Sequence, residues 1–208
     1  MSAPVEHSVV LATRNPHKVE ELRRILAPYG IELVGLPDDA PEVAETGATF
    51  ADNALLKARS AAAATGRVAV ADDSGLAVDA LNGMPGVLSV YWAGRARDDA
   101  ANLRLVLEQI EDVPDDRRGA AFVCAAAAAT PDGREVVAEG RVEGAILRTP
   151  RGAGGFGYDP IFLPTGSAVT TAEMAPEDKD AISHRGRAFR ALVPKLAELL
   201  GLPPGAAG

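Results

Sequence analysis

The chain has 208 residues, enough for one large domain or for one domain with an additional lobe. Its composition, 47% hydrophobic and 24% charged, is that of an ordinary globular protein. A formal net charge of -8 disfavours nucleic acid as a partner, so an anionic ligand would need locally gathered cations or a metal. The single cysteine, Cys124, excludes an internal disulfide, and we expect no signal peptide, no membrane span and a cytoplasmic location.

The first half of the chain alternates between strand and helix. Short apolar strands are expected at residues 8–13, 31–36 and 68–71. Asn15 and Thr49 are expected to cap the two intervening helices, the second of which covers residues 50–65, and Gly30 to end the first. This alternation predicts an α/β fold.

The second half adds antiparallel elements. A helix is expected at residues 99–111, followed by a hairpin of residues 119–129 and 134–146. Residues 72–94 are expected to be mostly loop. A last helix is capped by Ser183 and should kink at Pro194. We therefore predict a mixed sheet flanked by helices in one domain, residues 1–208, with a frayed tail at 201–208.

The stretch TRNPHK, residues 13–18, joins a strand to a helix start. Free backbone N–H groups and the positive end of the helix dipole favour an anion there, and Lys18 adds a charge. The alternative is an ordinary capped helix with a solvated lysine.

The stretch ETGATFADNALLK, residues 45–57, places Asn53 and Lys57 four residues apart on one helix face. Their apolar neighbours suggest a position near the interior, where a lysine attracts an anion. Glu45, on the preceding loop, is a candidate metal ligand. The alternative is a polar surface face.

The stretch VAVADDSG sets Asp72 and Asp73 after an apolar strand, followed by Ser74. Adjacent strand residues point to opposite sides, so the two carboxylates should have different partners. Carboxylates at a strand end suit Mg²⁺, which prefers oxygen ligands and often bridges to phosphates. The alternative is a turn started by aspartate.

Two further stretches carry candidate binding residues. RGAGGFGYDP contains a formal GxGxxG, but no helix follows it, so a dinucleotide site is rejected and Phe156 remains as a residue that stacks on a base or fills the core. KDAISHRG brings Lys179, His184 and Arg185 just ahead of the last helix, where their donors suit a phosphate or a carbonyl oxygen.

The motifs TRNPHK, ETGATFADNALLKA, ADDSGLAVDALNGMPG, GGFGYDPIF and AISHRG occur in this order. Together they resemble the Ham1 family of non-canonical purine nucleoside triphosphate pyrophosphatases, over about residues 9–200. The resemblance implies an elongated α/β fold with an active-site cleft between two lobes, and a homodimer. It implies Mg²⁺-dependent hydrolysis of dITP, ITP and XTP to the monophosphate and pyrophosphate.

The resemblance also implies roles for the candidate residues. Glu45 and Asp73 would hold Mg²⁺, with Asp73, ionised at a low pKa on the metal, as base for the attacking water and Asp72 beside it. The other implied substrate contacts are Thr13, Arg14, Asn15, Pro16, His17, Lys18, Asn53, Lys57, Ser74, Phe156, Gly157, Tyr158, Asp159, Lys179, His184 and Arg185. Donors such as His184 and Arg185 facing O6 of hypoxanthine or xanthine would reject adenine, which presents an amino group there.

The sequence departs from the family after Pro85, where GVLSVYWAG lacks a customary arginine. A Maf-type pyrophosphatase for modified pyrimidine nucleotides is the nearest alternative activity, and the FGYD and SHR stretches argue against it. A non-catalytic nucleotide-binding protein is the alternative from another class, and the full set of acidic residues and lysines argues against that.

Overall fold

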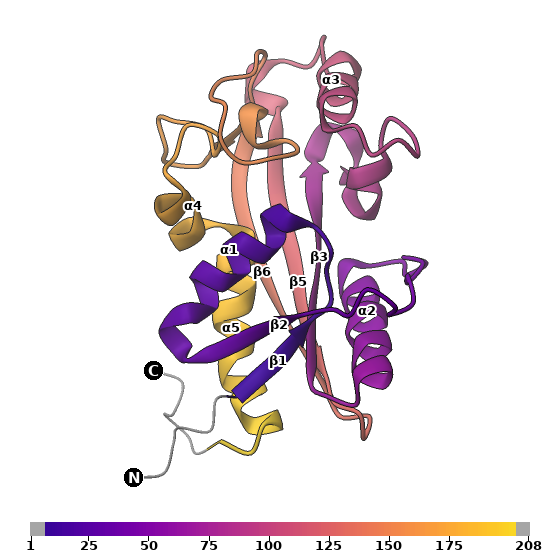
Figure 1. The fold of residues 1–208 in the computed structure, drawn as a ribbon. Helices are drawn as coiled ribbons and strands as arrows, with labels where there is room; N and C mark the ends of the chain where they lie inside the picture. Colours follow the sequence, from indigo (N-terminus) through magenta and orange to yellow (C-terminus); the bar gives the residue numbers. More distant parts are fainter. Residues whose placement is uncertain (1–6, 203–208) are drawn as a thin grey trace. The chain divides into compact units, whose positions relative to one another are not determined.

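The structure, a computed structural model, describes residues 7–202 and builds a mixed seven-stranded sheet (Figure 1). The strands are β1 (His7–Leu11), β2 (Ile31–Gly35), β3 (Ala69–Val78), β4 (Met84–Pro85), β5 (Gly119–Ala129), β6 (Glu135–Ile146) and β7 (Phe162–Pro164). Their hydrogen-bonded order is β2-β1-β3-β5-β6-β7, with β4 paired to β3. β1 pairs in parallel with β2 and β3, whereas β4 and β7 pair antiparallel. The predicted α/β class with a mixed sheet is confirmed.

The chain divides into two units that interleave in sequence. Unit 1 consists of Met1–Asp73, Ala125–Gly140 and Arg185–Gly208, and unit 2 of Ser74–Cys124 and Arg141–His184. β3, β5 and β6 therefore each contribute residues to both units. The predicted frayed tail lies almost wholly outside the described residues, at 203–208.

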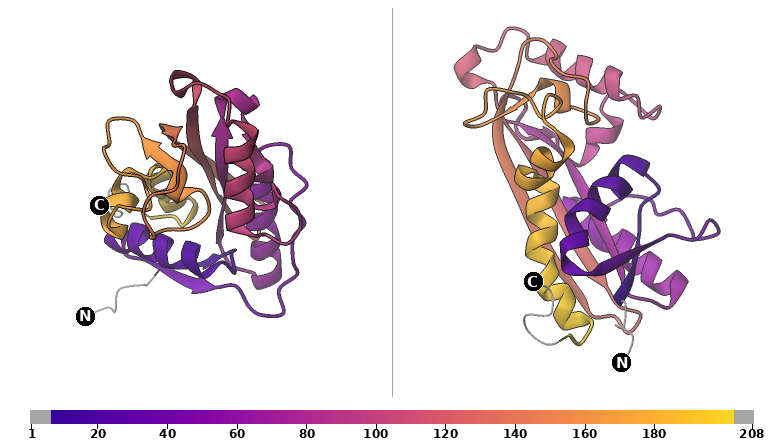
Figure 2. Two further views of the ribbon diagram at one scale, coloured as in Figure 1. Left: turned by 90° about the horizontal axis from the view of Figure 1, so that it is seen from above. Right: turned by 60° about the vertical axis from the view of Figure 1, so that its left-hand side comes forward.

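Unit 1 contains α1 (Pro16–Leu26), α2 (Phe50–Thr65) and nearly all of α5 (His184–Leu199). The views in Figures 1 and 2 place α2 on one side of the unit's strands and α1 and α5 on the other. The buried part of the interface under α2 is alanine except for Val10: Ala54, Ala58, Ala61 and Ala62 of the helix lie in one cluster with Ala69, Ala71, Ala125, Ala127 and Ala129 of the sheet. Such small side chains let the helix and the sheet approach closely.

The helix starts of unit 1 follow from local chemistry. The Asn15 side chain accepts a hydrogen bond from the His17 backbone N–H, and Thr49 forms a reciprocal capping box with Asp52. Gly66, at a φ of 65°, ends α2 in the left-handed conformation that glycine tolerates best. The predicted bounds of this helix, 50–65, are confirmed, whereas α1 ends at Leu26 and a helical turn fills the distance to Gly30.

Unit 2 contains α3 (Asp99–Gln109) and α4 (Pro176–Ile182). Its core is built from larger side chains than the alanine-rich core of unit 1. Phe122, Phe162, Ile161 and Tyr158 pack around Leu76 and Val78 of β3. The hairpin of β5 and β6 is close to its predicted bounds, although alanine favours helix, because burial in the sheet overrides that weak preference. Pro194 lies inside α5, which continues to Leu199.

One prediction about the sheet is wrong. β3 does not stop at Ala71, but continues through Asp72, Asp73, Ser74 and Gly75 to Val78. Residues 72–78 are strand, and only residues 79–94 consist of turns, short helical segments and β4. The carboxylates of Asp72 and Asp73 thus lie within a strand. Ion pairs compensate their negative charges there, whereas in a turn the two carboxylates would have been solvated.

Candidate active site

The adjacent carboxylates of β3 serve two separate sets of partners. Asp72 forms ion pairs with Lys18 of α1 and Arg185 of α5. Asp73 bonds instead to Asn53 and Lys57, both on α2. Because successive side chains of a strand leave on opposite sides, the two acids are directed at different helices, and the expectation of different partners is confirmed.

The Asp73 group joins the acidic loop before α2, residues 37–45, to the strand β3 through one ammonium, that of Lys57. Lys57 Nζ lies 2.6 Å from Glu45 Oε1 and 3.1 Å from Asp73 Oδ1, and Asn53 Nδ2 donates to Asp73 Oδ2 at 3.1 Å. Glu45 and Asp73, far apart in sequence, are therefore within reach of one cation. Thr49 and Asp52, which fix the start of α2, also fix where this lysine stands.

The Asp72 group is a buried row of alternating charges. Lys18 Nζ lies 3.0 Å and Arg185 Nε 3.1 Å from Asp72 Oδ2, and the Arg185 guanidinium also bonds to Glu21 of α1. Arg185 is only 2% exposed. A contact of Arg185 with a nucleobase stays a prediction, while its bonds in unit 1 make it a clamp between α5, β3 and α1.

Burial and charge set the ionisation of this centre. Burial raises the pKa of Asp72, but Lys18 and Arg185 more than offset it, and the net pKa lies well below the usual range. Burial raises the pKa of Asp73 above its ordinary value, and Lys57 counters this only in part. Burial tends to lower the pKa of Lys57, yet the carboxylates of Asp73, Asp72 and Glu45 raise it. Lys57 is therefore charged at neutral pH.

The loop before α1, the predicted anion site, is held by its own side chains. Thr13 Oγ1 accepts from the Asn15 N–H at 3.2 Å, and Asn15 Oδ1 from the His17 N–H at 3.0 Å. The Arg14 guanidinium donates to the backbone of the acidic loop, at 2.8 Å to the Ala40 carbonyl. Arg14, Asn15, Pro16 and His17 are exposed, so their contacts with phosphate stay predictions.

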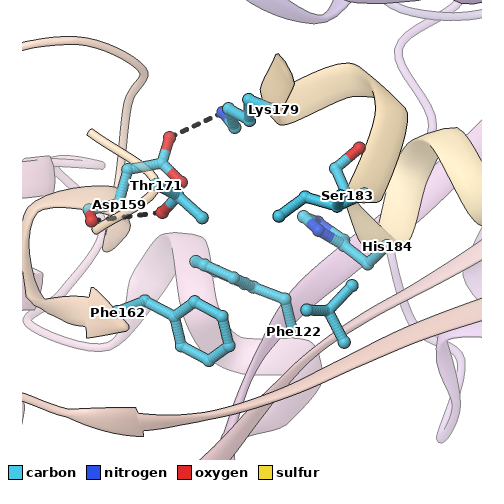
Figure 3. A pocket seen from close by; sticks show the side chains of 9 residues that line it. Phe122, Asp159, Phe162, Thr171, Lys179, Ser183 and His184 are labelled. Carbon is cyan, nitrogen blue, oxygen red and sulfur yellow. Dashed lines mark hydrogen bonds and ion pairs between the residues drawn. The ribbon is translucent and has the colours of Figure 1, made fainter. Parts of the chain in front are cut away.

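Three further predicted residues, Asp159, Lys179 and His184, lie in unit 2 and line a pocket (Figure 3). Its lining consists of Phe122, Val142, Asp159, Phe162, Thr171, Lys179, Ile182, Ser183 and His184. Figure 3 shows Asp159 bonded to Thr171 and Lys179, at 2.7 Å in each case. The His184 ring stacks on Phe122 with 4.8 Å between the centroids and an angle of 13°. The pocket thus combines aromatic walls with a buried ion pair.

The aromatic loop beside this pocket is tied down at three backbone or side-chain groups. The Phe156 N–H donates to Asp159, and the Gly157 N–H donates to Asp99 of α3 at 2.9 Å. The Tyr158 hydroxyl donates to the Ser89 carbonyl, and burial raises the pKa of this phenol. Lys179 Nζ lies 5.0 Å from the centre of the Phe156 ring, a cation–π distance.

Several residues of these two centres escaped prediction from the sequence. They are Glu21, Ser89, Asp99, Phe122 and Thr171. Glu21 follows Glu20 in α1 and Asp99 follows Asp98 at the start of α3, and nothing in the local pattern distinguishes either residue from a solvated acid. Ser74, which was predicted, is half-buried in β3 beside Asp73.

The carboxylate oxygens of Glu45 and Asp73 suit a hard divalent cation that takes its remaining ligands from water or phosphate. Among residues 7–202 no three His, Cys, Asp or Glu side chains gather as a ready-made metal cage. Glu45 and Asp73 nevertheless share one cation, Lys57, and Mg²⁺ commonly takes only one or two carboxylates and completes its shell with water and phosphate oxygens. The residues present therefore fit Mg²⁺ as a partly coordinated ion.

The fold and this centre define an α/β protein with a carboxylate-and-lysine site suited to the hydrolysis of phosphoanhydrides. The profile of the Ham1 family matches residues 9–195. The chain is 59% identical over 199 residues to the dITP/XTP pyrophosphatase of Mycobacteroides abscessus, an alignment that covers 93% of this chain and 97% of that one. It is 59% identical over 197 residues to the dITP/XTP pyrophosphatase of Streptomyces coelicolor, covering 93% and 98%.

A solved structure gives the same result for the fold. The HAM1 protein of Coxiella burnetii superposes with a TM-score of 0.84 at 42% identity, covering 92% of this chain and 99% of that one. The chain belongs to the Ham1 family, as its motifs indicated.

Proposed function

We propose that this chain hydrolyses dITP, XTP and ITP to the nucleoside monophosphate and pyrophosphate. The observation that carries the proposal is the Glu45–Lys57–Asp73 centre, which the loop before α2, the helix α2 and the strand β3 bring together within a chain of the Ham1 family. Two relatives that are 59% identical over nearly the whole chain are dITP/XTP pyrophosphatases, which supports the same substrate class.

The proposed roles follow from charge and position. A triphosphate carries about four negative charges, which Lys18, Lys57 and a divalent cation offset in a protein of net charge -8. The backbone of residues 13–18 adds donors at the start of α1. Glu45 and Asp73 hold Mg²⁺, which when bound supplies Lewis acidity and charge stabilisation at the phosphates.

Asp73 accepts the proton of the water that attacks the α-phosphorus. Asn53 and Lys57 fix its two oxygens, so the carboxylate is oriented before substrate arrives. Asp72, whose pKa lies far below neutral, stays ionised and holds Lys18 toward the same region of unit 1. Asp72 therefore positions a cation rather than moving a proton.

The pocket of unit 2 is the proposed base site. Phe156, on the loop beside the pocket, supplies a face for stacking, and Lys179 and His184 of the lining supply donors for O6 of hypoxanthine or xanthine. Adenine would place an amino group against these donors and is rejected. Arg185 could contact the nucleobase only if it broke its ion pairs with Asp72 and Glu21. Its main proposed role is therefore to hold α5, β3 and α1 together.

The wider setting is proposed on the same footing. We infer a single domain over residues 1–208, a homodimer, and action in the cytoplasm on the free nucleotide pool, without nucleic acid or membrane as partners. The family match over residues 9–195 supports the domain extent. No helix in the described part of the chain has the length and apolar character needed to cross a membrane.

A pyrophosphate-release assay with Mg²⁺ over a panel of eight nucleotides tests the proposal. We expect turnover of dITP, XTP and ITP far above that of ATP and GTP. Release of orthophosphate alone, preference for a modified pyrimidine nucleotide, or tight binding without turnover would each contradict it. Asp73→Asn should abolish nearly all turnover in a folded protein, and full activity of this variant would refute the assignment of the base.

A further inference from the structure

Asn53 is a buried amide whose two ends are committed to different parts of the Asp73 centre. Its Oδ1 accepts from the Gly47 backbone N–H at 2.7 Å, and its Nδ2 donates to Asp73 Oδ2 at 3.1 Å. The side chain is 1% exposed, so little room remains for a ligand. Both ends of the amide are therefore bonded within the protein, and a contact of Asn53 with substrate stays a prediction.

The chemistry of the two partners fixes the orientation of this amide. A backbone N–H only donates, and an ionised carboxylate only accepts, so the side chain between them must accept at one end and donate at the other. The amide of asparagine does this with two separate atoms, Oδ1 toward Gly47 and Nδ2 toward Asp73. Aspartate would keep the bond to Gly47 but would place a second carboxylate against Asp73.

The Gly47 bond connects Asn53 to the loop that carries Glu45. Gly47 has no room for a side chain, because a Cβ would lie 2.7 Å from Asn53 Oδ1 and 2.5 Å from Asp52 Cβ. The close approach therefore sets the path of residues 45–47 relative to α2. The Asn53 amide therefore holds the loop that carries Glu45 at a fixed position relative to the strand that carries Asp73. Lys57 bridges the two carboxylates.

We propose that Asn53 is a positioning residue that presents Glu45 and Asp73 to one divalent cation. The inference rests on the proposed function, in which these two carboxylates hold Mg²⁺. Groups that orient metal ligands by hydrogen bonds typically contribute about 10–100-fold to metal affinity or activity.

Asn102 of α3 offers a matched control in the other unit. It is 2% exposed, and its amide likewise accepts from a backbone N–H, that of Ala93 at 2.6 Å, and donates to an oxygen, the Val90 carbonyl at 3.1 Å. Asn53→Ala and Asn102→Ala each remove one bond from a backbone N–H and one bond to an oxygen, but only the first disturbs the Asp73 centre.

The test compares these variants in three measurements: urea unfolding, Mn²⁺ affinity of the nucleotide-free protein by electron paramagnetic resonance, and kcat and KM for dITP with Mg²⁺. We expect similar losses of stability in both, but a weakening of Mn²⁺ binding and a fall in kcat of about 10–100-fold only in Asn53→Ala. Asn53→Asp should lose kcat as well, because it cannot donate to Asp73.

Equal Mn²⁺ affinity and kcat in Asn53→Ala and Asn102→Ala would overturn the inference and leave Asn53 a structural residue. Recovery of full kcat in Asn53→Asp would also overturn it. If the Asn53 variants do not fold, Gly47→Ala disturbs the other end of the amide and should weaken Mn²⁺ binding in the same way.

The Mn²⁺ arm separates this inference from the proposed function. A wild-type protein that binds Mn²⁺ but releases no pyrophosphate from dITP refutes the proposed function, and the comparison of Mn²⁺ affinities still decides the role of Asn53. A wild-type protein that binds no Mn²⁺ overturns the inference, because no metal would exist for Asn53 to present.

Discussion

Replacing Arg185 by methionine should cost far more stability than replacing any exposed arginine. The side chain of Arg185 is 2% exposed and bonds to the carboxylates of Asp72 and Glu21, whose side chains are 0% and 8% exposed. Breaking a buried ion pair by removing one partner costs about 3–5 kcal/mol, because the remaining charge stays desolvated. Lys18 remains beside Asp72 and keeps the loss within that range.

For a chain of this length, a loss of that size corresponds to a fall in melting temperature of about 6–20 °C. Urea denaturation followed by circular dichroism measures the free energy of unfolding directly. Arg59→Met is the control, since Arg59 makes an equally well-formed bond to Glu135 but with a side chain that is 52% exposed, and exposed pairs contribute about 0–1 kcal/mol. An Arg185→Met variant no less stable than Arg59→Met would refute the reasoning that the clamp compensates buried charge.

Three more outcomes are expected. The pKa of Asp72 is lowered on folding, so its ionised form stabilises the fold above a pH of about 4, and this contribution is lost as the pH falls further. The difference in free energy of unfolding between wild type and Arg185→Met should therefore be complete at neutral pH and become smaller below a pH of about 4. A difference that stays constant in urea titrations at each pH would contradict this. Gly75→Ala should destabilise by about 1–3 kcal/mol, because its Cβ would lie 2.3 Å from the Ser89 Oγ that accepts the next backbone N–H of β3, and unchanged urea unfolding would refute the close contact. Lys57→Met should lower kcat for dITP at least about 100-fold, in line with the loss of one preorganised charge, and steady-state assays that show a change in KM alone would exclude this role.

Local rules predicted the elements with strong end signals. The second helix was placed correctly at residues 50–65 because Thr49, Asp52 and Gly66 mark both ends by backbone hydrogen bonds that involve only neighbours. The alanine-rich β5 was also identified, since its partner strand and the turn at Gly133 supplied context that alanine alone does not.

Prediction failed where distant residues decide the outcome. Asp72 to Gly75 have the composition of a turn, yet they remain strand because Lys18, Arg185 and Lys57 compensate the charges and Ser89 accepts the N–H of Leu76. None of these partners lies within ten residues of the acids in the sequence. The same limit hid Asp99, whose bond to Gly157 spans 58 positions.

For the site, the sequence identified the residue types but not their division of labour. Asn53 and Lys57 were correctly placed on one helix face, but the enclosure of Asn53 by Gly47 and Asp73 depends on a loop path that no periodicity reveals. Arg185 is likewise read from sequence as a donor for a ligand, whereas in the structure two carboxylates engage it.

The alanine interface under α2 has a consequence for how this protein tolerates change. Ala54 and Ala58 flank Lys57 on the helix, and they touch a sheet surface made of further alanines. Any larger residue on either surface would lift the helix, and with it the amine that faces Glu45 and Asp73. Larger core residues therefore cannot be used to raise thermal stability at this interface. Substitutions there are limited by side-chain volume rather than by polarity. Stabilising substitutions compatible with turnover should be sought in unit 2 or on the outer face of α5 instead.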